Sequence, residues 1–258
     1  MAALVMTKAM FKRYGIELRR YYVNTVSTLA SVYLIFLLIF LGLRAFAGGG
    51  ADFGDTTSGL VVGFMVWFLA VFAYSELSWV LMQEAQQGTL EQLSMSPLGL
   101  KRVLIGRLAA SLVFDVAIMF LFLLLMMLTT GKWLSLNLAS VLPLLLVTVT
   151  GVFGIGFIMG GLALVFKRIQ QSFQILQFIF VALVAAPVQA FPLVKFLPLS
   201  WGTHLINRAM IGGESIAQMP LADLLLLAGN SVFYFTLGLL VFGYFEKVAR
   251  DRGLLGHY

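Results

Sequence analysis

The sequence contains no cysteine, and only 11% of its 258 residues are charged. Without cysteine the chain forms no disulfide bridge and no thiolate or zinc–thiolate site. A soluble domain has about 25% charged residues, so the composition excludes a soluble domain large enough to hold an enzyme core. The chain also lacks the Gly-x-x-x-x-Gly-Lys-Ser/Thr motif that cradles nucleotide phosphates. We therefore expect no ATP hydrolysis by this chain itself and no catalytic residues.

Hydrophobic residues make up 61% of the chain and gather in long runs. A helix needs about 20 apolar residues to cross the hydrocarbon core of a bilayer. We therefore predict an all-α integral membrane protein with a single transmembrane domain, residues 1–258, and six spans. The predicted spans are residues 23–46, 60–83, 103–130, 138–166, 170–190 and 221–245. Pro187 removes a backbone hydrogen bond, so we expect it to bend the fifth span near its outer end.

Residues 1–22 have the pattern of a helix that lies on the membrane surface. On a helical wheel, a face with Phe11 and Tyr14 stands opposite a charged face. The cations of the charged face are Lys8, Lys12, Arg13, Arg19 and Arg20. Lys and Arg opposite aromatic residues are typical of an interfacial helix. The alternative is a soluble tail whose periodicity arises by chance.

Residues 191–220 are too apolar for a plain loop, but prolines and glycines break them. We expect one or two short helices here that dip into the outer leaflet, with Ser200 as a possible N-cap of a helix over residues 201–210. Irregular backbone at that depth is tolerated only against protein or a wet cavity. We expect Glu214 and Asp223 to be solvated. His204 has no Cys, Asp or Glu at ligand spacing, so no metal site is expected.

The positive charges predict the orientation of the chain. Cations gather on the cytoplasmic side of membrane proteins, and thirteen of the 17 Lys and Arg residues fall on one side of the six predicted spans. The other four are Arg44, Lys132, Lys195 and Arg208. Both termini and residues 84–100 are therefore predicted to be cytoplasmic. The net charge of +6 indicates membrane lipid, not nucleic acid, as the partner of these cations.

Two carboxylates lie inside predicted spans. A charge at the centre of a spanning helix costs about 2.5–3.5 kcal/mol on insertion scales, so Glu76 and Asp115 should face protein or water. One interpretation is a polar lining of a transport path or of an inner gate. The other is structural: hydrogen bonds to neighbouring serines, or an ion pair with Arg107. Both stay open at this point.

Aromatic residues of the last two spans also have a functional and a structural interpretation. In the first they line an apolar path for the substrate, and in the second they pack against other helices or face lipid. These residues are Phe173, Phe178, Phe180, Tyr234 and Phe235. Gly156 and Gly160 form a Gly-x-x-x-Gly pair, which indicates close helix–helix packing and not a nucleotide site.

Residues 84–100 are the main polar connection between two long apolar runs. Gly88 should end the incoming helix, and Thr89 with Gln92 has the spacing of a capping box. Ser96 precedes Pro97, and a residue before proline is pushed out of the helical region. The result is a helix of under two turns, with Leu90 and Leu93 on one side. It is either a docking element or an ordinary loop that rests on the membrane.

The residues of this loop resemble the cytoplasmic loop of type-2 ABC transporter permeases. The matching residues are Glu84, then Gly88, Thr89, Leu90, Glu91, Gln92 and Leu93, then Ser96, Pro97 and Leu98. In that family the loop is a coupling helix that docks into a separate ATPase subunit. Charged residues often precede it there, whereas residues 85–87 here are Ala-Gln-Gln. The layout of the whole chain, from the interfacial helix to the outer segment between spans five and six, resembles the same family.

The resemblance implies the permease subunit of an ABC exporter. It implies a dimer with a second copy or a similar chain, and ATP and Mg on the partner ATPase subunit alone. It also implies the plasma or inner membrane of a prokaryote, and export of small amphipathic molecules, drugs or lipids. The alternatives are export of a lipid-linked glycan by the same machinery, an ATP-independent carrier, or a membrane assembly protein that transports nothing.

Overall fold

The computed structural model describes residues 11, 15, 16, 19–46, 54–86, 89, 99–166 and 169–253. Within these ranges the chain forms helices and their connections and no strand, which confirms the prediction of an all-helical protein. The elements are α2 (Tyr22–Phe46), α3 (Gly54–Gln86), α5 (Leu100–Thr130), α6 (Leu138–Val165), α7 (Gln170–Val184), the short 3-10 helix η1 (Pro192–Phe196), α8 (Ser200–Met210), the 3-10 helix η2 (Ile216–Gln218) and α9 (Leu221–Asp251).

Among the described residues, five helices are long and apolar enough to cross a membrane. They are Tyr22–Ala45, Thr57–Glu84, Leu100–Thr130, Leu138–Val165 and Leu221–Asp251. These stretches agree with five of the six predicted spans, although α3 already begins at Gly54, inside the loop predicted from the sequence. The chain is therefore a helical, multi-pass membrane protein.

The structure differs from the prediction at the fifth span, residues 170–190. Its helix, α7, has 15 residues and ends at Val184, so it is roughly 22 Å long at 1.5 Å per residue. Ala186 precedes Pro187 and is therefore pushed out of the helical region. The expectation that Pro187 bends a continuing helix is wrong, because the helix has already ended before the proline.

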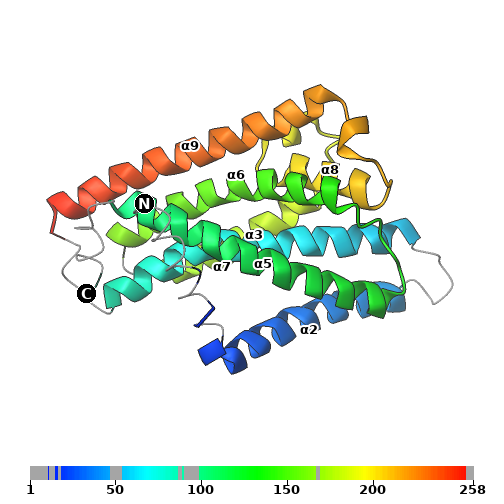
Figure 1. Cartoon of the computed structure of the whole chain (residues 1–258), viewed down its shortest axis with the longest axis horizontal. Coiled ribbons are helices and arrows are strands. Elements are labelled where there is room, and N and C mark those ends of the chain that lie inside the picture. The colour runs from blue at the N-terminus through cyan, green and yellow to red at the C-terminus, as the bar shows by residue number, and fades with distance from the viewer. Residues whose placement is uncertain are drawn as a thin grey trace.

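The helices lie side by side, and α6 runs between α3 and α9 (Figure 1). Glycines on two sides of α6 allow this. A Cβ on Gly154 would collide with the backbone of Tyr234, and a Cβ on Gly238 would collide with the backbone of Gly154. On the other side, a Cβ on Gly156 would lie 3.1 Å from the Tyr74 carbonyl oxygen, and Gly160 packs equally closely on α3. The predicted packing role of the Gly156–Gly160 pair is confirmed.

Helix α2 is attached to the rest of the bundle by only part of its length. It runs obliquely to the other helices and approaches them toward its C-terminal end (Figure 1). Phe36 is fully buried, with its ring 5.3 Å from that of Phe64 on α3. Tyr33 stands edge-on to Phe122 of α5 at 5.5 Å. Most other side chains of α2 are exposed.

The segment between α7 and α9 contains short helices, as predicted. α8 begins at Ser200, but Ser200 is not the cap, because Leu199 occupies that position with φ 71° and no side-chain cap hydrogen bond forms. The Ser200 hydroxyl instead donates to the Leu183 carbonyl at 2.8 Å. It thereby joins the start of α8 to the end of α7.

Helix α9 supplies donors to the end of η1 and the residue after it. The Asn230 amide donates to the carbonyls of Lys195 and Leu197, each at 3.2 Å. The Tyr234 hydroxyl donates to the Phe196 carbonyl at 3.1 Å. Three successive carbonyls are therefore satisfied by side chains of one helix.

Candidate functional site

The end of α3 and the beginning of α5 border the loop that the sequence singles out. Glu84 is 7% exposed. The Thr89 hydroxyl donates to Glu84 Oε2 at 2.6 Å, and the Thr89 amide donates to the Glu84 carbonyl at 2.9 Å. Thr89 thus binds back onto the last turn of α3. Gly99, with φ 75°, precedes α5 in a conformation that favours glycine.

The other residues predicted for this loop lie outside the described residues. They are Gly88, Leu90, Glu91, Gln92, Leu93, Ser96 and Pro97. The capping box between Thr89 and Gln92 therefore stays a prediction.

An ion pair joins the two helices that border this loop. Arg107 Nε on α5 lies 3.3 Å from Glu76 Oε1 on α3. The Arg107 and Glu76 side chains are 16% and 22% exposed, so both charges are largely shielded. The ion pair that the sequence offered as a structural explanation of Glu76 is present.

Asp115 lies further along α5 and is 5% exposed. At 1.5 Å per residue it stands roughly 12 Å from Arg107 along the helix axis, so it does not share the position of the ion pair along α5. Of the serines considered as partners of the carboxylates, Ser78 is buried and its Oγ has no hydrogen-bond partner in the described part of the chain, and the other two donate to backbone carbonyls. The Ser75 hydroxyl donates to the Val71 carbonyl and the Ser111 hydroxyl to the Leu108 carbonyl.

The aromatic residues of α7 lie on different faces of that helix. Phe173 and Phe180 are buried against Tyr74, with ring centroids at 6.0 and 5.0 Å. The Tyr74 hydroxyl donates to the Phe173 carbonyl at 2.8 Å. Phe178, in contrast, is 74% exposed, and Pro187 is exposed beyond the helix end. Phe173 therefore anchors α7 on α3, whereas Phe178 faces outward.

The aromatic residues predicted on α9 also have packing roles. The Tyr234 hydroxyl donates to the Phe196 carbonyl, as described above. Phe235 stands edge-on to Phe157 of α6 with ring centroids 5.9 Å apart. Both residues therefore hold α9 against its neighbours.

A charged cluster at the opposite end of the bundle was missed by the sequence analysis. Arg208 on α8 binds Glu214 at 2.7 Å and Asp223 at 3.0 Å. The two carboxylates were predicted to be solvated: their side chains keep 38% and 24% of their surface exposed, and each is also paired with Arg208. The Trp201 indole also donates to the Asp223 carbonyl at 3.0 Å. These contacts fix α8 to the first turn of α9.

His204 and Lys195 flank the ring of Trp201 in the same region. The His204 ring stacks on Trp201 at 5.0 Å, and Lys195 Nζ lies 4.9 Å from the Trp201 ring centroid. Burial lowers the pKa of His204, and the nearby cations Arg208 and Lys195 lower it further. The spacing of Trp201, His204 and Arg208, three and four residues apart, was the available sequence signal, since it places them on one helix face.

Part of the predicted interfacial helix is described. Phe11, with helical backbone, packs its ring 6.1 Å from that of Phe114 on α5. Arg19 and Arg20 are exposed, and the Arg20 guanidinium lies 5.8 Å from the Tyr21 ring centroid. Lys8, Lys12 and Arg13 lie outside the described residues.

Comparison of the sequence with models of known protein families and with curated proteins finds no match.

Proposed function

We propose that this chain is the membrane permease subunit of an ABC exporter, driven by a separate ATPase subunit that binds the loop between α3 and α5. The observation that carries the proposal is the Glu76–Arg107 ion pair, which joins the two helices on either side of the loop that has the coupling-helix pattern. A push on that loop would move both helices together, because their inner parts are tied by this pair.

The lengths of α3 and α5 support the proposal that these two helices act as a lever. α3 has 33 residues and α5 has 31, so they are roughly 50 and 46 Å long. Both exceed the roughly 30 Å of the hydrocarbon core. In the proposed orientation this surplus length would carry the end of α3, with Glu84, and the start of α5 beyond the bilayer toward the ATPase.

Contacts of α3 provide a route for the movement. Tyr74 lies against Gly156 of α6 and donates a hydrogen bond to α7. A displacement of α3 would therefore shift α6 and α7 as well. α7 is the proposed moving wall of the path, because its outer face, with Phe178, is exposed.

The proposed transport path lies between two copies of the chain. The faces that α6 turns toward α3 and α9 are close-packed and leave no wide polar channel there. α7 with the irregular segment after it would complete the sixth crossing and dip into the outer leaflet, leaving both termini in the cytoplasm of a prokaryotic cell. The proposed cargo is a small amphipathic molecule, a drug or a lipid, and ATP and Mg would bind the partner subunit only.

The test is co-purification with an ATPase subunit and stimulation of its ATPase activity in vesicles. Leu93→Asp and Glu91→Lys, in the proposed docking loop, should reduce stimulation at least about tenfold, the effect of roughly 1.4 kcal/mol. Leu136→Asp is the matched control, because Leu136 lies in the connection between α5 and α6 at the other end of the bundle. Unchanged binding and stimulation in both loop variants would contradict the proposed docking.

A second measurement tests on which side of the membrane the loop between α3 and α5 lies. Because the chain has no cysteine, a single Leu93→Cys variant reacts with a thiol reagent at one known position. A reagent that does not cross membranes should label it only from the cytoplasmic side. Labelling from the outside of intact cells would contradict the proposed orientation.

A further inference from the structure

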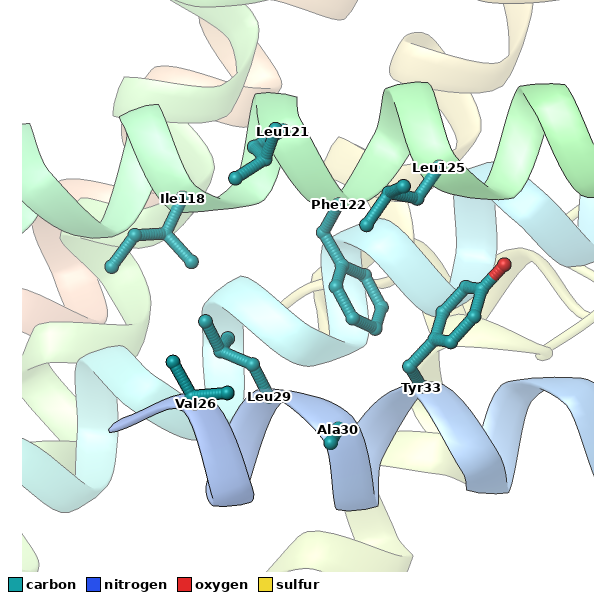
Figure 2. Close-up of a pocket in the computed structure, with 8 residues that line it drawn as sticks. All are labelled: Val26, Leu29, Ala30, Tyr33, Ile118, Leu121, Phe122 and Leu125. Atoms are coloured by element: carbon teal, nitrogen blue, oxygen red, sulfur yellow. The ribbon is translucent and has the colours of Figure 1, made fainter. Parts of the chain in front are cut away.

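An apolar groove separates the N-terminal half of α2 from α5. Its volume is about 200 Å³, and its lining residues are Val26, Leu29, Ala30 and Tyr33 of α2 and Ile118, Leu121, Phe122 and Leu125 of α5. Figure 2 shows side chains of the two helices facing each other across this space. Val26 and Leu121 are both 60% exposed, so the groove is open at its side.

The groove lies where α2 diverges from α5. At the middle of α2, Tyr33 stands edge-on to Phe122 of α5, and the ring of Phe36 contacts Phe64 of α3. Toward the N-terminal end of α2 most side chains are exposed. The groove is therefore a wedge between the two helices that closes at the aromatic contacts of Tyr33.

The size of the groove selects its occupant. A dry, apolar cavity of about 150 Å³ holds one benzene molecule, so about 200 Å³ suits a short stretch of one hydrocarbon chain. In a bilayer, the hydrocarbon nearest to a side opening is a lipid acyl chain.

The charge beside the groove selects the headgroup. Arg19 and Arg20 directly precede the turn at Tyr21 and the start of α2 at Tyr22, and the groove begins four residues later at Val26. Arg19 and Arg20 are exposed, and neither has an ion-pair partner among the residues that the structure describes. Tyr21 and Tyr22 are 57% and 64% exposed, as is typical of residues at the level of lipid headgroups.

We propose that the groove between α2 and α5 is a binding site for one anionic phospholipid, whose acyl chain lies between Val26 and Phe122 and whose phosphate group lies at Arg19 and Arg20. The bound lipid fills the wedge and completes the packing of α2. The site requires only that the chain lie in a membrane, so its test is independent of any ATPase partner.

The test uses the full chain in nanodiscs of phosphatidylcholine that contain a photoreactive phosphatidylglycerol with its reactive group in the acyl chain. Peptide mass spectrometry then locates the adducts. Label should concentrate on the groove-lining peptides of α2 and α5. Ala30→Trp fills the groove and should reduce that label at least about fivefold. Ser31→Trp is the matched control, because Ser31 is exposed and adds the same ring one position away from the lining; it should leave the label unchanged.

A second arm tests the headgroup. Each cation near a membrane surface is worth about a fivefold preference for anionic lipid. Arg19→Gln and Arg20→Gln together should lower the preference for phosphatidylglycerol over phosphatidylcholine about 25-fold, whereas Arg19→Lys with Arg20→Lys should retain most of it. Because these side chains are exposed, folding of the variants can be verified by an unchanged thermal midpoint.

Three results would overturn the proposal. The first is label spread evenly over all lipid-facing helices. The second is a groove signal that survives Ala30→Trp. The third is an efficient cross-link between two copies of an Ala30→Cys variant, because it would show that the face is covered by a second chain.

Discussion

Arg107 Nε lies 3.3 Å from Glu76 Oε1 and ties the first third of α5 to the last third of α3. Breaking a fully buried pair by removing one partner costs about 3–5 kcal/mol. Because this pair retains some exposure, we expect Glu76→Gln to destabilise the protein by about 1–3 kcal/mol. Thermal unfolding in detergent checks this.

The control for this prediction is a double-mutant cycle with Arg107→Gln. The double variant should lose less stability than the sum of the two single variants, and strict additivity would show that the pair contributes nothing. If Glu76→Gln assembles normally and exports normally, Glu76 has no role in the transport path.

Gly154 of α6 contacts the backbone of α9 so closely that a methyl group does not fit. Overpacking costs about 1–3 kcal/mol, so Gly154→Ala should destabilise the protein by at least that amount. Gly229→Ala on α9 is the matched control, because nothing lies within 4 Å of its added Cβ. It should be neutral or stabilise by up to about 1 kcal/mol. Equal thermal midpoints for the two variants would contradict this account of the helix crossing.

His204 should make stability depend on pH. Its pKa is lowered in the folded protein, first by burial and then by repulsion from Arg208, so the unfolded chain binds a proton more readily. The contribution of neutral His204 is therefore fully present above the ordinary histidine pKa of about 6.5 and is lost as the pH falls below it. Thermal midpoints of the wild type should fall between pH 7.5 and pH 5.5, and His204→Phe should reduce that fall. His257→Gln removes the other histidine and separates its contribution.

Thr89 should couple the loop to α3. Its hydroxyl donates to the Glu84 carboxylate at 2.6 Å, and a hydrogen bond to a charged group is worth about 1.5–3 kcal/mol. Thr89→Val should therefore reduce stimulation of the proposed ATPase partner at least about fivefold while co-purification persists. Thr28→Val is the control, because the Thr28 hydroxyl bonds only to its own helix, at the Asn24 carbonyl. If Thr89→Val stimulates the ATPase as strongly as the wild type does, this hydrogen bond does not transmit movement.

Features set by local sequence were predictable. Long apolar runs gave five membrane-spanning candidates close to their structural limits, and the Gly156–Gly160 spacing gave a real helix contact. The Glu76–Arg107 pair was among the alternatives because charges inside apolar runs have few partners.

Features set by tertiary contacts were not predictable. Pattern alone favours a span through residue 190, but Ala186 and Pro187 end α7 after 15 residues. Ser200 has the side chain of a cap, yet it bonds to Leu183, which lies 17 residues away. The pairing of Arg208 with Asp223 depends on the fold of the turn between them. No local pattern encodes such pairings.

The donors that satisfy the carbonyls of residues 195–197 come from Asn230 and Tyr234, and both belong to α9, which is synthesised after this stretch. An unsatisfied carbonyl in hydrocarbon costs several kcal/mol. We therefore expect this stretch to keep its contact with water during synthesis until α9 emerges. A nascent chain stopped before residue 221 should hold it there, so that α9 governs when residues 195–197 can leave the water.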